Sequence, residues 1–161
     1  MPKQVMDRRA ADNVYLHKDF HGALSNALIY LEQRFGEEAV HEYLRRFAQS
    51  FYAPLRQELR ERGLAAIADR LRRVYAEEGA EAQIDLADDE LIVRVPACPA
   101  VTHMRRHGYP VSRLWRATIS TVNKAICEDS EFDFDLVSYD ELTGASVQRF
   151  YRREGTRREE A

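Results

Sequence analysis

The chain has 161 residues, 45% of them hydrophobic and 10% aromatic, which predicts one globular domain and excludes wholesale disorder. The formal net charge is −3, and the 21 arginines are scattered over several segments, so we expect no nucleic-acid partner. No apolar run reaches the roughly 18 residues of a membrane span, and the chain has only two cysteines. We therefore expect no membrane partner and a cytoplasmic protein with free thiols.

The first half of the chain predicts helices, with residues 12–78 almost wholly helical. From residue 12 to 35 the pattern is helical, because one stripe at steps of three or four carries His17, His21, Leu24, Leu28, Leu31 and Phe35. Gly36 is expected to end this helix. A second helix begins at Glu37 and is kinked or broken by Pro54. A third helix is expected after Gly63.

The pattern then changes to alternation, which predicts strands. Apolar residues alternate with polar ones over residues 82–86 and again over 91–95, separated by the turn-like ADDE, so residues 82–95 predict a hairpin. A second hairpin is expected over residues 131–153, where FDFDL alternates and DELTG turns the chain. Between the hairpins we expect a short helix ending at His107 and a longer helix that starts near Pro110.

This order predicts an α+β fold, in which N-terminal helices pack on a four-stranded antiparallel sheet made of two hairpins linked by helices. We assign residues 1–155 to a single domain. It has a helical part, 12–78, and a sheet-and-helix part, 82–153. Residues 156–161 form a polar tail.

The segment VPACPAVTHMRRHGYP contains the candidate chemistry. Cys98 precedes a proline, and proline is favoured at the first position of a helix, so Cys98 is expected at or near the helix N-cap. Free N–H groups at that end stabilise a thiolate, which is the species that attacks carbon or binds a soft metal. The alternative is a small buried residue at a strand–helix corner. Cys127, beside Glu128 and Asp129 near a helix C-terminus, is expected to be the less reactive thiol.

Four of the five histidines form two pairs with a spacing of four residues, His17 with His21 and His103 with His107. This spacing puts both imidazoles of a pair on one side of a helix, where they can chelate zinc or another divalent transition metal. His17, His21, Cys98 and His103 are therefore candidate metal ligands. A buried histidine bonded to a carboxylate or a carbonyl is the alternative for the first pair, and an exposed position is expected for His107.

Two further features have simpler interpretations. Asp133 and Asp135 lie on one face of a predicted strand, and we expect them to face solvent or to pair with Arg149 or Arg152 across the hairpin rather than to act as an acid–base pair. The sequence contains no P-loop, GxGxxG, GxSxG or CxxC motif, so nothing in it supports nucleotide, α/β-hydrolase or thioredoxin chemistry.

The second half of the chain, about residues 82–153, is similar to the small bacterial L-2-amino-thiazoline-4-carboxylate hydrolase-like family, and more distantly to 4-vinyl reductase type ligand-binding domains. The similarity rests on Cys98-Pro99, on FDFDLVSYD and on TGASVQRF. In those families a cysteine shortly follows the glycine of the last turn. The corresponding glycine here is Gly144, and it is followed by Ala145, Ser146 and Val147. The resemblance implies a small-molecule site near Cys98, either hydrolytic or only binding.

The leading functional hypothesis is therefore a small-molecule hydrolase acting on a heterocyclic or amide-like substrate. Cys98 would be its nucleophile, and His103 and His17 its base or metal ligands, with His21 in support. The alternatives are a non-catalytic small-molecule or metal-binding sensor module with the same site, and a subunit whose helical face docks on a partner. A small-molecule ligand is the expected partner, and assembly into a homo-oligomer stays open.

Overall fold

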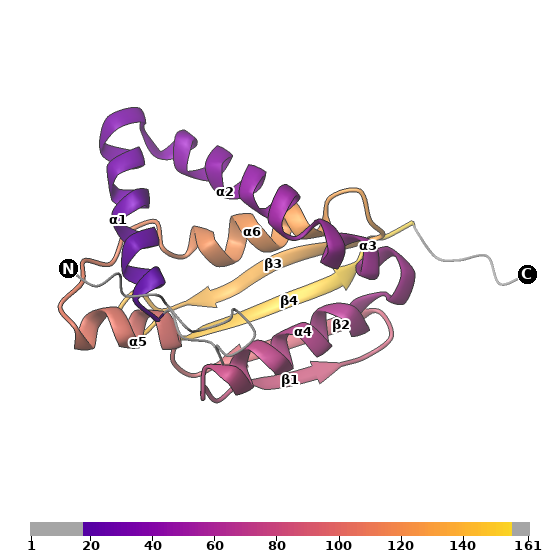
Figure 1. Ribbon diagram of the computed structural model, residues 1–161. Helices are drawn as coiled ribbons and strands as arrows, with labels where there is room; N and C mark the ends of the chain where they lie inside the picture. Colours follow the sequence, from indigo (N-terminus) through magenta and orange to yellow (C-terminus); the bar gives the residue numbers. More distant parts are fainter. Residues whose placement is uncertain (1–17, 156–161) are drawn as a thin grey trace, which may run out of the picture.

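A computed structural model of the chain describes residues 18–155 (Figure 1). Within that range helices and strands follow in the order α1 (Lys18–Phe35), α2 (Glu37–Phe51), α3 (Ala53–Arg62), α4 (Leu64–Glu77), β1 (Gln83–Leu86), β2 (Glu90–Val95), α5 (Pro99–Arg106), α6 (Ala117–Cys127), β3 (Phe132–Tyr139) and β4 (Ser146–Arg152). Residues 12–17 of the first predicted helix and the predicted tail lie outside the described residues.

The four strands form one antiparallel sheet in the order β1-β2-β4-β3. The two hairpins join along β2 and β4, where Leu91 is paired with Phe150. On β3, Phe134 lies opposite Phe150, and their ring centroids are 4.7 Å apart. All three side chains are fully buried, which fixes the inward face of the sheet. The predicted α+β class and the sheet of two hairpins are confirmed.

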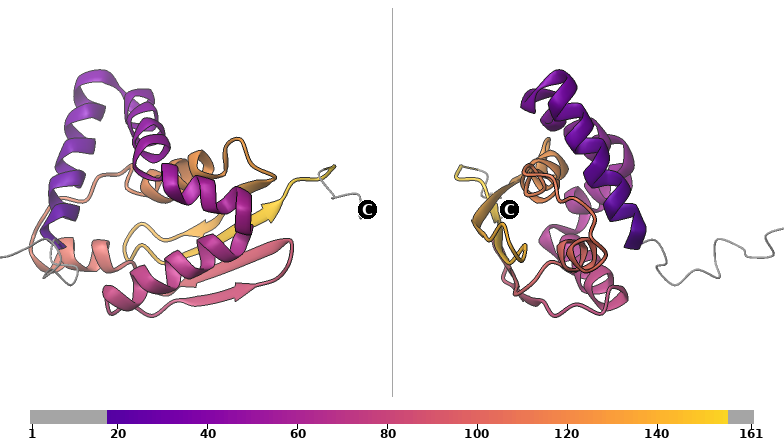
Figure 2. Two further views of the ribbon diagram at one scale, coloured as in Figure 1. Left: turned by 45° about the vertical axis from the view of Figure 1, so that its right-hand side comes forward. Right: turned by 90° about the vertical axis from the view of Figure 1, so that its left-hand side faces the viewer.

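The helices cover one face of the sheet, as the end-on view in Figure 2 shows. Helix α4 packs on β1 and β2, and α6 packs on β3. Helix α2 lies over α6, and α1 packs on α2 and α5 rather than on the sheet. Helix α1 is therefore an outer element, one side of which faces away from the rest of the fold (Figures 1 and 2).

The other face of the sheet carries charged side chains. Asp135 is paired with Arg149 across β3 and β4, and Arg153 Nε lies 3.9 Å from Asp133 Oδ2. Cross-strand pairs of opposite charge stabilise a sheet modestly. Asp135 lies opposite Arg149 as predicted, but the ion pair of Arg149 is with Glu90, whose Oε1 lies 2.5 Å from Arg149 Nε.

The predicted helix boundaries hold where glycine or proline sets them. Gly36, at φ 87°, separates α1 from α2, and the chain breaks at Tyr52 with Pro54 in the first turn of α3. The predicted start of α6 near Pro110 is wrong, because α6 begins at Ala117. Before it, the Ser112 carbonyl accepts from Trp115 N and the Ser112 hydroxyl from Leu114 N, which makes a separate turn.

Phe35, expected on the apolar stripe of the first helix, is exposed, and so is Phe51 at the end of α2. Phe35 is 64% exposed and Phe51 is 62% exposed, since each is the last residue of its helix and projects past the core. In the described part of the chain, no helix is both long and apolar enough to cross a membrane.

Candidate functional site

Cys98 lies at the junction between β2 and α5, as predicted. It is the N-cap of α5, with φ −73° and ψ 122°, and Pro99 is the first helical residue. Its backbone N–H donates to the Thr143 carbonyl at 2.9 Å, which ties the junction to the β3–β4 turn. Gly144 of that turn comes so close that a Cβ added there would lie 2.4 Å from the Cβ of Cys98. The thiol is therefore held in one place by two segments of the chain.

The sulfur of Cys98 is half-buried and has several polar neighbours. Burial raises the pKa of this thiol, and the carboxylate of Glu78 raises it further. The nearby backbone N–H groups of Val101 and Ala100 and the indole N–H of Trp115 oppose that rise, although the Cys98 side chain makes no capping hydrogen bond to α5. The predicted lowering of the pKa is thus wrong, because loss of solvent outweighs the helix N-terminus.

Glu78, just after α4, is an unexpected member of this site. Its side chain is only 8% exposed, and Glu78 Oε1 lies 3.7 Å from Nε2 of His21, whose side chain is 17% exposed. The ring of His21 also meets that of Trp115 edge-on, with centroids 6.3 Å apart. His21 on α1 is therefore linked to the surroundings of Cys98 through Glu78 and Trp115. The alternative of a histidine beside a carboxylate fits the position of His21, but at 3.7 Å the two groups are not hydrogen-bonded.

Polar side chains from α4 and β4 complete the site. Burial raises the pKa of Tyr75 to about 12, a hydrogen bond with Gln148 opposes the rise, and Cys98 and Glu78 add to it. Gln148 is 2% exposed, and its Nε2 donates to Ser146 Oγ at 3.1 Å. We name as the Cys98 cluster the set His21, Tyr75, Glu78, Cys98, Trp115 and Gln148.

Sequence reasoning missed Tyr75, Glu78 and Gln148. A signal existed for Gln148. It lies with Ser146 and Phe150 on the inward face of β4, where an apolar residue is expected. No comparable signal marks Glu78, which follows a helix rich in charged residues and resembles any other surface glutamate in the sequence.

The second histidine pair forms a separate group. The rings of His103 and His107 have centroids 4.1 Å apart, and each lies near the ring of Tyr109. His107 is exposed, as expected. His17 lies outside the described residues, and within residues 18–155 no group of three His, Cys, Asp or Glu side chains is placed to hold a metal ion. His21, Cys98 and His103 are therefore not brought together as metal ligands.

Cys127 is fully buried at the end of α6. Burial raises the pKa of its thiol to about 12, and the carboxylate of Asp133 adds to the effect. The pKa of Cys127 is raised, as predicted, but the predicted neighbours, Glu128 and Asp129, are not the groups that raise it. Glu128 accepts from Arg45 and Gln49, and Asp129 pairs with Arg56, so both carboxylates turn toward α2 and α3.

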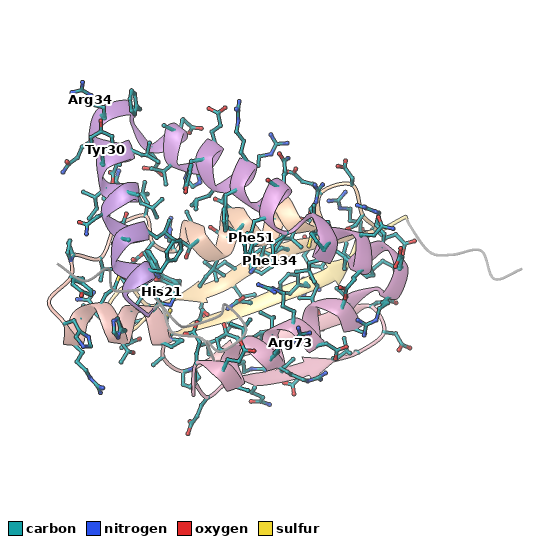
Figure 3. All side chains as sticks on the ribbon, in the orientation of Figure 1. His21, Tyr30, Arg34, Phe51, Arg73 and Phe134 are labelled. Atoms are coloured by element: carbon teal, nitrogen blue, oxygen red, sulfur yellow. The ribbon has the colours of Figure 1, made fainter. Side chains whose placement is uncertain are left out.

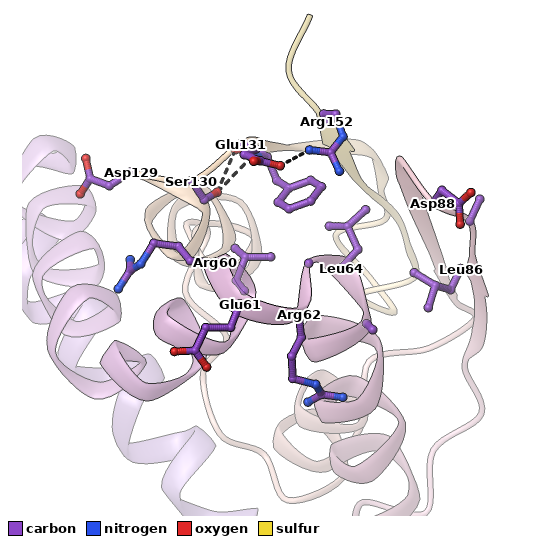
Figure 4. Close-up of a pocket in the computed structure, with 15 residues that line it drawn as sticks. Arg60, Glu61, Arg62, Leu64, Leu86, Asp88, Asp129, Ser130, Glu131 and Arg152 are labelled. Carbon is purple, nitrogen blue, oxygen red and sulfur yellow. Dashed lines mark hydrogen bonds and ion pairs between the residues drawn. The ribbon is translucent and has the colours of Figure 1, made fainter. Parts of the chain in front are cut away.

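Two open cavities lie near the ends of the sheet. One, of about 840 Å³, is lined in part by Tyr139 and Ser146, which border the Cys98 cluster. The other, of about 760 Å³, lies at the opposite end between α3, α4 and the β1–β2 turn (Figure 4). Arg152 pairs there with Glu131, whereas Arg62 and Asp129 pair with residues outside the lining, and the cavity contains no predicted site residue.

Comparison with known proteins adds no assignment: no family model matches this chain, and no curated protein matches it.

Proposed function

We propose that this protein binds a small heterocyclic ligand bearing N–H groups at the Cys98 cluster. The observation that carries the proposal is the carboxylate of Glu78, which is more than nine-tenths buried. Among the described residues its nearest charged partner is His21, and 3.7 Å is too long for a hydrogen bond. Burying a carboxylate costs free energy, and a ligand with N–H donors would offset that cost.

The other members of the cluster favour the same class of ligand. Amidine-like N–H groups can pair with a carboxylate through two parallel hydrogen bonds. Trp115, whose ring meets that of His21 edge-on, would offer an aromatic face to a flat ring. The raised pKa of Tyr75 keeps its phenol protonated at neutral pH, so it can donate to a ligand atom. The resemblance of residues 82–153 to the amino-thiazoline carboxylate hydrolase-like family supports this choice independently of the geometry.

Hydrolysis by Cys98 is the second candidate, and one observation favours it. The N–H groups of Ala100, Val101 and Trp115 lie near the sulfur and lower the pKa of the thiol, and such donors would stabilise a thiolate once it forms. The nearby carboxylate of Glu78 could take the thiol proton. The thiolate would then add to the amidine carbon. The ring C–N bond would break, with the leaving nitrogen taking the proton held by Glu78. Water would then displace the Cys98 sulfur from that carbon, which regenerates the thiol and releases the ring-opened carbamoyl product.

Calorimetric titration tests the binding proposal. The probes are L-2-amino-thiazoline-4-carboxylate and 2-aminothiazoline, which is the same ring without the carboxylate. We expect at least one to bind the full chain, and Glu78→Gln to weaken that binding by about tenfold or more, as loss of a charge-assisted pair predicts. The control is Glu77→Gln, because Glu77 directly precedes Glu78 and is exposed. Equal binding by Glu78→Gln, or no binding of either probe, would contradict the proposal.

The variant Cys98→Ser distinguishes the binding function from the hydrolytic one. A binding module should bind the probe in both forms and yield no product by NMR. A hydrolase should yield the ring-opened product with the wild-type chain and none with Cys98→Ser, while binding persists.

A further inference from the structure

Helix α1 turns an apolar face to the solvent. On its inner side Leu28 and Ser25 are fully buried, whereas Phe20 and Tyr30 on the other side are each 59% exposed. Ala23 and Ala27 lie between these two aromatics at steps of three, four and three residues, and both are exposed. Figure 3 shows Tyr30 projecting away from the other helices. The four residues therefore form one stripe along the outer side of α1.

The same stretch has no charge. No Asp, Glu, Lys or Arg occurs from Phe20 to Leu31, although these residues make up 32% of the chain. A helix with one face in water normally carries charged residues on that face, and a helix that is apolar all round is normally buried on both sides. Among the residues that the structure describes, other elements bury only the inner side of α1, so we expect a partner on its outer side.

We infer that a second copy of this chain covers the outer face of α1, with the two α1 helices antiparallel across a twofold axis. Read from either end, the stripe is aromatic, alanine, alanine, aromatic. An axis between Ala23 and Ala27 sets Phe20 of one copy against Tyr30 of the other, and Ala23 against Ala27. A twofold interface requires such a self-complementary pattern, and an unlike partner does not. The alanines allow close helix approach, and aromatic pairs close both ends.

The exposed aromatic area of this face is one part of what a dimer needs. Phe20 and Tyr30 are each 59% exposed. At roughly 150–250 Å² for each aromatic side chain, their exposed parts come to roughly 180–300 Å² per copy. The interface of a stable complex takes about 800 Å² from each partner. The other exposed residues of that face, among them Ala23, Asn26, Ala27 and Arg34, and neighbouring elements must therefore supply the larger share.

Sedimentation equilibrium of the full chain tests this inference. We expect the wild type to have twice the 18.7 kDa mass of one chain at about 50 µM, and Ala27→Arg and Tyr30→Lys to have the mass of one chain. Circular dichroism checks that both variants keep their helix content. The control is Leu142→Arg, because Leu142 is an apolar residue 70% exposed in the β3–β4 turn, and this variant should stay dimeric.

A disulfide tests the register. Chains with Ala23→Cys mixed with chains with Ala27→Cys should form a mixed disulfide under mild oxidation, and chains with Leu142→Cys should not. A wild type that is monomeric at every concentration would overturn the inference, and an unlike partner or a membrane would then be left as the occupant of this face. A dimer that survives Ala27→Arg, or mixed chains that fail to cross-link, would overturn it as well.

Discussion

Cys98 and Cys127 differ in what surrounds their sulfur atoms. Cys98 is half-buried with N–H groups nearby, whereas Cys127 is fully buried beside Asp133. The proline after Cys98 made its N-cap position predictable. Its burial was not predictable, because the residues that enclose it come from α4, the β3–β4 turn and the segment before α6, which are distant in the sequence.

Alkylation should distinguish the two thiols. We expect iodoacetamide to modify Cys98 before Cys127, and the rate at Cys98 to rise about tenfold per pH unit from pH 7 to 9, because its raised pKa keeps the thiolate fraction small throughout. Mass spectrometry of the full chain measures both sites. A rate that levels off below pH 8 would show that the pKa is lowered instead.

Cys127 should make the fold sensitive to alkali. Below pH 9 its thiol is protonated in both the folded and unfolded states, and above pH 9 the unfolded state loses a proton that the folded state keeps up to about pH 12. The free energy of unfolding should therefore fall with rising pH, by about 2 kcal/mol from this group between pH 8 and 10.5. Urea unfolding at both values measures it. Cys127→Ala should lose less over the same interval, and an equal loss in both proteins would contradict the assignment.

At the scale of elements, local chemistry accounts for most of what could be predicted. Alternation gave the two hairpins, and Gly36 and Pro54 gave helix boundaries. The start of α6 was missed because Ser112 closes a turn with its own hydroxyl, and a helical pattern does not reveal that competition. The junction of Cys98 with the β3–β4 turn was missed too, since it depends on how β2 and β4 pair.

That junction should tolerate no side chain at Gly144. Gly144→Ala would place a methyl group 2.4 Å from the Cβ of Cys98 and 2.9 Å from Cγ2 of Val101, at φ +67°. We expect the free energy of unfolding to fall by about 2–4 kcal/mol, combining overpacking with left-handed strain. The control is Gly108→Ala, whose φ is +71° and whose Cβ would meet nothing within 4 Å, so it should lose only about 1 kcal/mol. Equal losses in urea unfolding would mean that the turn is loosely packed.

For the whole molecule, the Cys98 cluster is a product of tertiary structure. His21, Glu78 and Trp115 come from α1, the end of α4 and the segment before α6. The sequence nominated Cys98 and His21 one by one, and only the packing of these segments links them through Glu78. His103 was nominated on equal grounds and belongs to a different group, because its ring meets those of His107 and Tyr109.

The central claim is that Glu78 is buried for a ligand and not for the fold. A buried carboxylate kept for binding lowers stability, so replacing it with an apolar side chain of similar length should raise stability. The most direct measurement is urea unfolding of Glu78→Met in the absence of ligand, with Glu77→Met as the exposed control. We predict that Glu78→Met gains about 1–3 kcal/mol, while Glu77→Met stays within about 0.5 kcal/mol of the wild type. A loss of about 1 kcal/mol or more for Glu78→Met would contradict the account, because it would mean that the carboxylate serves to hold His21 and α1 in place.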